Sequence, residues 1–282
     1  MIELKTRLQN LSTRMAPRAL WVLAGSGLGS FLVYWLVIMR SVPLAENWQT
    51  KLLDLGNFLE KDPWPALGIL AGFILLFILY GLAFWAVGRA PTRKAWLLVV
   101  GWALLFFIPL LLVYPYGAAD IFDNIVHGRI LGVYGANPFA QAAVDFKDDI
   151  FVPYSYWKNA PSGYGPLWEV MAAGAARLAG EDFFTNIYVF KILPGMFLLG
   201  SAAVAALLLR RESPARALGA FLLLSWNPEA LYETVGNGTM LMSGVASISS
   251  IACRPLVALT TSMSWFSSTD VSAKMLRASS ST

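Results

Sequence analysis

The chain has 282 residues, of which 57% are apolar and 13% are charged. Soluble domains are about 45–50% apolar and about 25% charged, so this composition indicates a membrane protein. Lys and Arg number 21 against 17 for Asp and Glu, and this small excess makes nucleic acid an unexpected partner. With a single Cys, Cys253, and a single His, the chain excludes an intrachain disulfide and a His/Cys zinc site. A metal would need carboxylate ligands.

Four apolar stretches are long enough to cross a bilayer as helices, which takes about 20 residues. The sequence predicts these spans at residues 19–39, 64–88, 95–119 and 187–209. A fifth begins at Ala217, but Asn227, Pro228 and Glu229 interrupt it before it has finished crossing. We therefore expect an all-α, polytopic helical membrane protein with about five transmembrane helices, the fifth incomplete. The first span is longer than a cleavable signal peptide and is expected to stay as an anchor.

Cations and acids alternate along the chain. The leader (residues 1–18) and the turns at 88–95 and 210–216 are rich in Lys and Arg, whereas segments 40–63 and 120–186 are mixed or acidic. Because short cytoplasmic loops collect Lys and Arg, we expect a multi-pass protein of the cell membrane with a cytoplasmic N-terminus. The long segment 120–186 then faces the extracytoplasmic side.

Segment 120–186 has about 67 residues, too many for a simple connector. Its many aromatic residues argue against disorder and favour helices lying at the membrane interface. A helix starting at residue 120 would carry four polar residues on one face: Asp120, Asp123, Asn124 and His127. A solvated face at the bilayer surface explains this pattern as well as a functional site does. Asp120, however, follows 25 uncharged residues, and partial burial there would raise the pKa of its carboxyl toward values useful for proton abstraction.

Two rigid turns follow in the same segment. Residues 135–139, Gly-Ala-Asn-Pro-Phe, are typical of a helix end followed by a turn. Residues 161–168 form a second turn rich in glycine and proline. The stretch 167–179 after it is too short and too charged to cross a membrane, and we expect it to lie along the surface or to re-enter.

Four ordered motifs stand out between about residues 95 and 238. They are Asp120-x-Phe122 leading to Gly128-Arg129, Gly135-x-Asn137-Pro138-Phe139, Tyr164-Gly165-Pro166-Leu167, and Trp226-Asn227-Pro228 before Gly236-Asn237-Gly238. Together they resemble the membrane mannosyltransferases of the GT-C glycosyltransferase superfamily. In that superfamily a multi-span enzyme takes a sugar from a polyprenyl-phosphate donor, and an aspartate at the start of an early outer loop acts as catalytic base.

By position, the resemblance implies that Asp120 is the base, with Asp123 a second candidate. We expect the substrate contacts to come from Arg129, His127, Asn137, Tyr164 and Lys191. The partners would be a polyprenyl-phosphate sugar, mannose by resemblance, a lipid or glycan acceptor on the extracytoplasmic face, and the bilayer. No cofactor is expected, although the chemistry leaves room for a divalent cation. His127 stands where the family pattern suggests an acid, which counts against a carboxylate metal site.

The two cations have alternative roles. Either Arg129 or Lys191 would stabilise the leaving phosphate. Arg129 fits a lipid phosphate or an ion pair with Asp123 equally well. For Lys191, snorkelling to the lipid headgroups is the favoured interpretation.

The chain also departs from the resemblance. The superfamily has about twice as many spans, and after Gly238 the expected polar residues are replaced by Thr-Met-Leu-Met and a Ser/Thr-rich segment, 239–282. We expect a frame shift near Gly238, so that residues 1–238 are the front part of a longer enzyme. A genuine flexible Ser/Thr-rich tail is the alternative.

Three functions are consistent with these features. A membrane hexosyltransferase is favoured. A transporter or channel subunit should carry ionisable residues inside its spans, where Lys191 stands alone near an end. A non-catalytic membrane scaffold would leave the aspartate, the arginine and the two Asn-Pro turns unexplained. An inactive fragment of a glycosyltransferase is a further alternative.

Overall fold

A computed structural model describes residues 2–50, 63–118 and 120–239 of the chain. These residues form helices and turns, with an isolated bridge between Pro43 and Val113 and no named strand. The all-helical fold predicted from the sequence is thus confirmed. Segment 240–282, on which the frame-shift hypothesis bears, lies outside the described residues, and the hypothesis stays a prediction.

The helices follow one another with short connections. In chain order they are α1 (Ile2–Val33) with its π-helical continuation η1 (Tyr34–Met39), α2 (Leu44–Asn47), α4 (Pro63–Val87), α5 (Arg93–Leu111), α6 (Asp120–Gly132), the 3-10 turns η2 (Ala143–Asp145) and η3 (Val152–Tyr154), α7 (Pro166–Ala179), α8 (Phe183–Leu209), α9 (Pro214–Ser225), α10 (Pro228–Leu231) and the π-helical η4 (Tyr232–Gly236). Four helices are long and apolar enough to cross a membrane: Pro17–Met39, Trp64–Val87, Arg93–Leu111 and Phe183–Leu209.

The third predicted span is too long at its end. The sequence predicted a helix through residue 119, but α5 ends at Leu111 and the chain continues in extended form. Pro115 explains this difference, because it lacks an N–H for the helix and forces Tyr114 out of the α region. The Tyr114 N–H instead bonds to the Val42 carbonyl at 2.9 Å. Asp120 therefore begins a separate helix rather than ending a crossing.

At the break in the fifth apolar stretch, α9 ends and a new short helix, α10, begins with an N-cap. Trp226 ends α9 and anchors the chain by donating from Nε1 to the Val99 carbonyl of α5 at 2.9 Å. The Asn227 side chain accepts from Glu229 N and Ala230 N and so caps α10. Helix α9, with 12 residues, is shorter than a full crossing.

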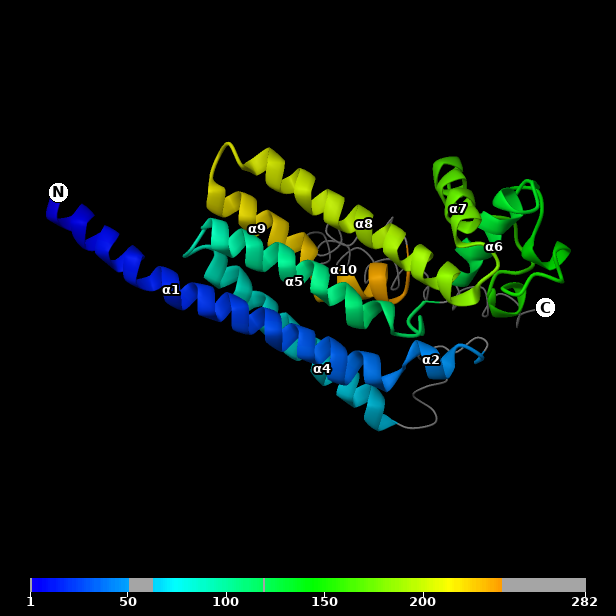
Figure 1. The fold of residues 1–282 in the computed structure, drawn as a ribbon, viewed down its shortest axis with the longest axis horizontal. Coiled ribbons are helices and arrows are strands. Elements are labelled where there is room, and N and C mark those ends of the chain that lie inside the picture. The colour runs from blue at the N-terminus through cyan, green and yellow to red at the C-terminus, as the bar shows by residue number, and fades with distance from the viewer. Residues whose placement is uncertain (1, 51–62, 119, 240–282) are drawn as a thin grey trace, which may run out of the picture. The chain divides into compact units, whose positions relative to one another are not determined.

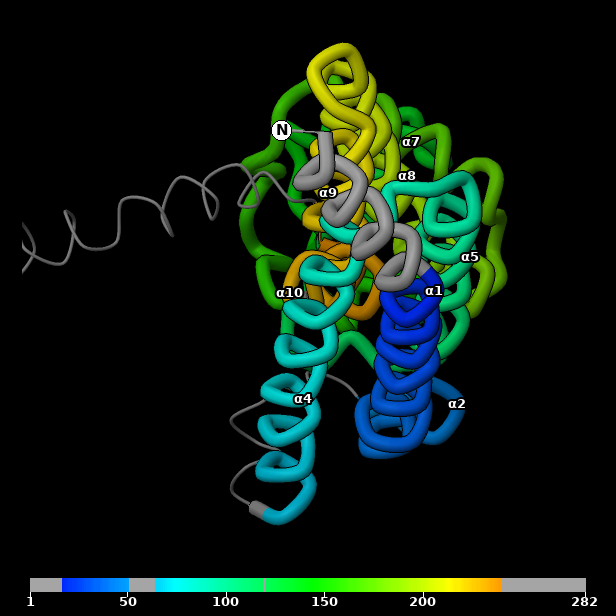
Figure 2. Tube along the Cα trace, turned by 90° about the vertical axis from the view of Figure 1, so that its left-hand side faces the viewer, coloured from blue at the N-terminus to red at the C-terminus, as the bar shows by residue number. Residues whose placement is uncertain are grey.

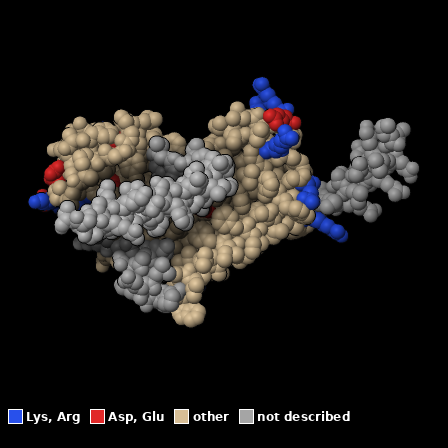
Figure 3. Space-filling model, turned by 180° about the vertical axis from the view of Figure 1, so that it is seen from behind, with Lys and Arg blue, Asp and Glu red and all other residues tan. Residues whose placement is uncertain are grey.

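The spans pack into a bundle within the compact unit Met1–Met240. Helix α1 contacts α4 and α5, and α8 contacts α9 (Figure 1, Figure 2). Helices α6 and α7 lie at the opposite end from the turns that join α4 to α5 and α8 to α9 (Figure 1). On the face shown in Figure 3, the described charged side chains gather toward the two ends, and few appear on the described surface between them. This pattern suits a bilayer-spanning bundle, and its orientation stays a prediction.

Helices α6 and α7 approach each other through small residues. A Cβ atom at Gly128 would lie 2.6 Å from the Ala172 carbonyl oxygen, and one at Gly132 would lie 2.5 Å from that of Ala173. Both distances are shorter than atoms tolerate, so glycine is what allows this approach. Arg177 adds a bond from Nε to the Gly132 carbonyl at 2.6 Å. Helix α6 is thereby held against α7.

We expect Gly128→Ala to lower the free energy of unfolding by about 1–3 kcal/mol, because the added methyl meets backbone that has little room to move. Thermal unfolding in detergent micelles measures the effect. Gly174→Ala in α7 is the matched control, because its Cβ would meet nothing within 4 Å and a helical alanine is more favourable than glycine. Equal stability of the two variants would contradict the close approach.

Candidate active site

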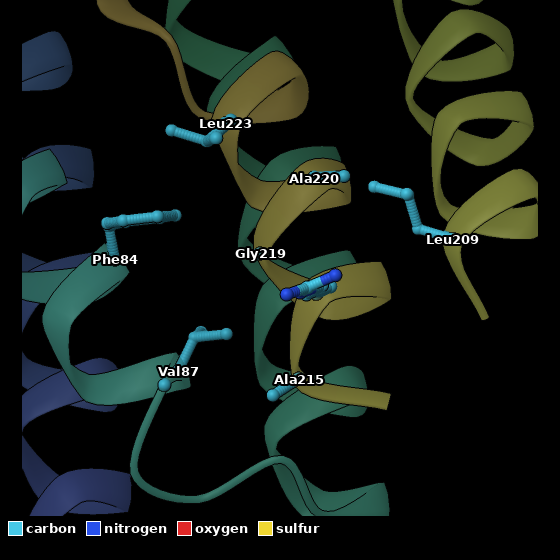
Figure 4. A pocket seen from close by; sticks show the side chains of 9 residues that line it. Phe84, Val87, Leu209, Ala215, Gly219, Ala220 and Leu223 are labelled. Carbon is cyan, nitrogen blue, oxygen red and sulfur yellow. The ribbon is translucent and has the colours of Figure 1, made fainter. Parts of the chain in front are cut away.

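Two cavities contrast in chemistry. One of about 370 Å³ lies among α4, α8 and α9 and is lined by apolar side chains such as Phe84 and Leu223 (Figure 4). Its one charged lining residue, Arg216, pairs with Glu212 at 2.9 Å. This cavity offers no acid or base. The second, of about 350 Å³, lies at the α6 end and is lined by Asp120, Asp123, His127, Trp157, Ala160, Pro161, Gly163 and Tyr164.

The polar face of α6 points into the protein. The alternative of a solvated face at the bilayer surface is therefore wrong for Asp123, Asn124 and His127. Helix α6 spans Asp120–Gly132, as the sequence predicted, but Asp123, Asn124 and His127 are only 3%, 0% and 4% exposed. Asp120 is half-buried at the cavity. Burial raises the pKa of the Asp120 carboxyl, which brings it closer to the range useful for a general base.

Asp123 is held more tightly than Asp120. The Ser155 hydroxyl and the Trp157 N–H both donate to its Oδ1, the latter at 3.1 Å. Burial nevertheless raises the pKa of Asp123 above its usual range, with these bonds opposing and the nearby Asp120 charge adding. The more accessible Asp120 is the better placed of the two for contact with a substrate.

Tyr164 lines the same cavity as Asp120 and Asp123. Burial first, and then the charges of Asp120, Asp123 and Glu169, raise the pKa of its phenol to about 12. The phenol therefore stays protonated. Glu169 is itself buried, accepts from the Ser162 hydroxyl through Oε1, and has no partner for Oε2 among the described residues.

His127 is a further lining residue of the cavity, and its imidazole is neutral at pH 7. Burial lowers the pKa of its imidazole, and the Ala160 carbonyl opposes that shift only in part. Its Nδ1 has no hydrogen-bond partner among the described residues. A neutral ring with a free nitrogen suits a contact with a sugar hydroxyl.

Arg129 occupies a different environment from the one predicted. Its guanidinium donates to Asp149 at 2.6 Å, to the Gly180 carbonyl at 3.0 Å and to Glu181 at 2.7 Å. The pairing with Asp123 allowed by the sequence is therefore wrong. Arg129 is 2% exposed and does not line the Asp120 cavity, so it joins α6 to the loops before η3 and after α7.

Lys191 does not snorkel to the headgroups, because its side chain is fully buried. Its ammonium donates to the carbonyls of Leu110, Leu111 and Val113, at 3.2 and 3.4 Å for the first two. Leu110 and Leu111 are the last residues of α5 and Val113 follows the helix, so the lysine supplies a donor to carbonyls at the C-terminal end of α5. Lys191 lines no part of the Asp120 cavity.

Asn137 is exposed in the turn after α6. Its Oδ1 accepts from Phe139 N at 3.0 Å, and Gly135 just before it has φ +66°. These features confirm the predicted helix end and turn. They give Asn137 a local structural contact, away from the cavity lining.

Sequence reasoning missed several residues of the site. Ser155 and Trp157 reach Asp123 from an irregular loop, where no periodicity could place them. Asn124 was predicted on the polar face, and its Oδ1 accepts from Trp168 Nε1 at 2.9 Å. Among residues 2–50, 63–118 and 120–239 there is no group of three or more His, Cys, Asp or Glu placed to hold a metal ion.

The loop between α6 and α7 is ordered by aromatic stacking, as its composition predicted. Phe122 of α6 stacks on Tyr154 with ring centroids 5.2 Å apart, and Phe151 stacks on Phe183 at the same distance. The Phe183 ring also lies 5.3 Å from that of Tyr154. This cluster fixes the loop that carries Ser155 and Trp157.

Comparison with known proteins identifies a family for most of the chain. Residues 28–263 match the family model described as "Alpha-(1->6)-mannopyranosyltransferase, N-terminal domain". No curated protein and no solved structure matches the chain. The matched residues include all four motifs and the whole of the Asp120 cavity. The chain therefore belongs to this family of mannosyltransferases and is a glycosyltransferase-type membrane protein.

Proposed function

We propose that the chain transfers mannose from a polyprenyl-phosphate donor to a lipid or glycan acceptor on the extracytoplasmic face, in the manner of a GT-C enzyme, with Asp120 as general base. The family description names an α-(1→6) linkage, so the acceptor would present an O6 hydroxyl to the donor sugar. The observation that carries the proposal is a half-buried carboxylate, Asp120, in an acid-lined cavity at one end of an apolar helix bundle.

The proposed reaction inverts the sugar at C1. The acceptor hydroxyl oxygen attacks C1 while its proton passes to the Asp120 carboxylate. The bond from C1 to the phosphate oxygen breaks, and polyprenyl phosphate leaves with the electron pair. The protonated Tyr164 phenol and the neutral His127 ring would bind sugar hydroxyls, and Asp123 would hold the loop from Ser155 to Trp157 around the acceptor.

A transfer assay tests this proposal. The purified full chain, in liposomes, is given polyprenyl-phosphate [14C]mannose and an α-(1→6)-linked mannose disaccharide. We expect label in a trisaccharide with the unaltered chain. Absence of transfer to this acceptor and to lipid acceptors extracted from a mannosylated cell envelope would contradict the proposal.

Transfer should depend on pH through Asp120. A general base acts in its ionised form, and burial raises the pKa of this carboxyl. The rate should therefore fall as the pH is lowered through that raised pKa, at a higher pH than for an exposed aspartate. A profile of kcat/KM from pH 4 to 9 measures this. An acid limb at the pKa of a free aspartate, or no acid limb, would argue against Asp120.

A further inference from the structure

The segment Gly236-Asn237-Gly238 folds back onto the start of α6, about 120 residues earlier in the chain. The Gly117 N–H donates to Asn237 Oδ1 at 3.2 Å. A Cβ atom at Gly117 would lie 2.5 Å from Asn237 Nδ2, so the two groups are in close contact.

Gly238 makes a second contact on the other side of Asp120. It has φ +69°, which favours glycine, and a Cβ there would lie 2.4 Å from Ile121 Cδ1. Gly117 lies three residues before Asp120, and Ile121 directly follows it. The contacts of Asn237 and Gly238 thus bracket the proposed base.

A second carboxylate, that of Glu233, lies just before this segment in the chain. Glu233, in η4, is partly buried and interacts electrostatically with Asp120. The Asn237 amide lies beside Glu233 and Tyr232 as well. Asn237 is fully buried. Its neutral side chain therefore fills a space where a negatively charged one would repel both acids.

We infer that Asn237 is a positioning residue for Asp120: its side chain fixes the backbone before α6, and its amide adds no negative charge beside Glu233 and the base. This inference rests on the proposed function and extends it to a residue from the other end of the described chain. The ionisable groups around Asp120 are Asp123 and His127 on α6, Tyr164 before α7, and Glu233 in η4. Tyr116 and Tyr232 do not line the cavity, and they interact with each other and with Glu233.

Two substitutions separate the two parts of this role. Asn237→Ala removes the acceptor for the Gly117 N–H, and we expect kcat to fall about tenfold to a hundredfold with little change in the KM for the donor. Asn237→Asp keeps an acceptor but adds a negative charge, which should raise the pKa of Asp120. Its acid limb should move to higher pH, and its activity should recover at alkaline pH where that of Asn237→Ala does not.

Asn47→Ala is the matched control, because Asn47 also bonds to backbone, at 2.9 Å from the Pro43 carbonyl, but lines no part of the cavity. It should leave the pH profile unchanged. If Asn237→Asp does not fold, Asn237→Ser replaces it and should keep more activity than Asn237→Ala. Equal, pH-independent losses in the Asn237 variants, in parallel with lower thermal stability, would overturn the inference.

The proposed function fails in a different way. If Asp120→Asn keeps full transfer activity, the base is wrong whatever the Asn237 variants do. If Asp120→Asn is inactive and the Asn237 variants keep the unaltered rate and acid limb, the positioning role alone is wrong.

Discussion

Asp120→Asn should lower the rate of mannose transfer by about 10²–10⁴-fold, the usual contribution of a positioned general base. The amide keeps the size and shape of the side chain, but it replaces one acceptor oxygen with a donor nitrogen and cannot take a proton. The KM for the donor should change little, because the loss affects the transition state rather than binding. Initial rates with labelled polyprenyl-phosphate mannose measure both quantities.

The same variant should be at least as stable as the unaltered chain. Burial raises the folded-state pKa of Asp120, so the neutral form is the favoured one in the fold. Its contribution to stability is present below the unfolded pKa and is lost as the pH rises through the folded pKa. The neutral asparagine avoids this loss at pH 7. An inactive variant with unchanged or higher melting temperature supports a catalytic role, whereas a fall in both activity and stability would not.

Arg129→Met should have the largest effect on stability, about 3–5 kcal/mol, because it removes one partner of a buried pair. Asp149 is 0% exposed in its side chain and would keep only the Tyr134 hydroxyl and the Phe151 N–H as donors. The methionine has similar volume but leaves this carboxylate without its cation. Chemical or thermal unfolding in micelles measures the loss.

Glu181→Gln provides the control for Arg129→Met. Glu181 pairs with the same guanidinium at 2.7 Å, but its side chain is 73% exposed. Exposed pairs contribute about 0–1 kcal/mol, so this variant should unfold almost like the unaltered chain. If the two substitutions cost the same, the buried pair is not what holds the loop to α6.

The sequence predicted the spans well because hydrocarbon imposes a length and an apolar composition on each of them. Three of the four long helices lie where the apolar runs placed them, and the remaining one, α5, ends early, before a segment that contains a proline. The helix at Asp120 was also predictable, because its polar residues repeat with the helical period. The packing of this helix against α7 was not predictable, because it depends on Gly128 and Gly132 lying against the backbone of α7.

The roles of the two cations could not be derived from sequence. Arg129 and Lys191 stand where a phosphate ligand or a headgroup contact is a reasonable expectation. Their real partners, carboxylates in the loops and carbonyls at the end of α5, depend on how distant segments meet. The contact of Asn237 with Gly117 is of the same kind, because it joins positions about 120 residues apart.

The location of the Asp120 cavity on the extracytoplasmic side is the claim on which the proposed reaction depends. With Cys253 replaced by Ala, single cysteines at two exposed positions, Pro91 in the α4–α5 turn and Asn159 beside the cavity, report on the two ends of the bundle. In intact cells an impermeant maleimide should label Asn159→Cys and leave Pro91→Cys unlabelled until the cells are broken. Labelling of Pro91→Cys alone would place the cavity in the cytoplasm and contradict the account.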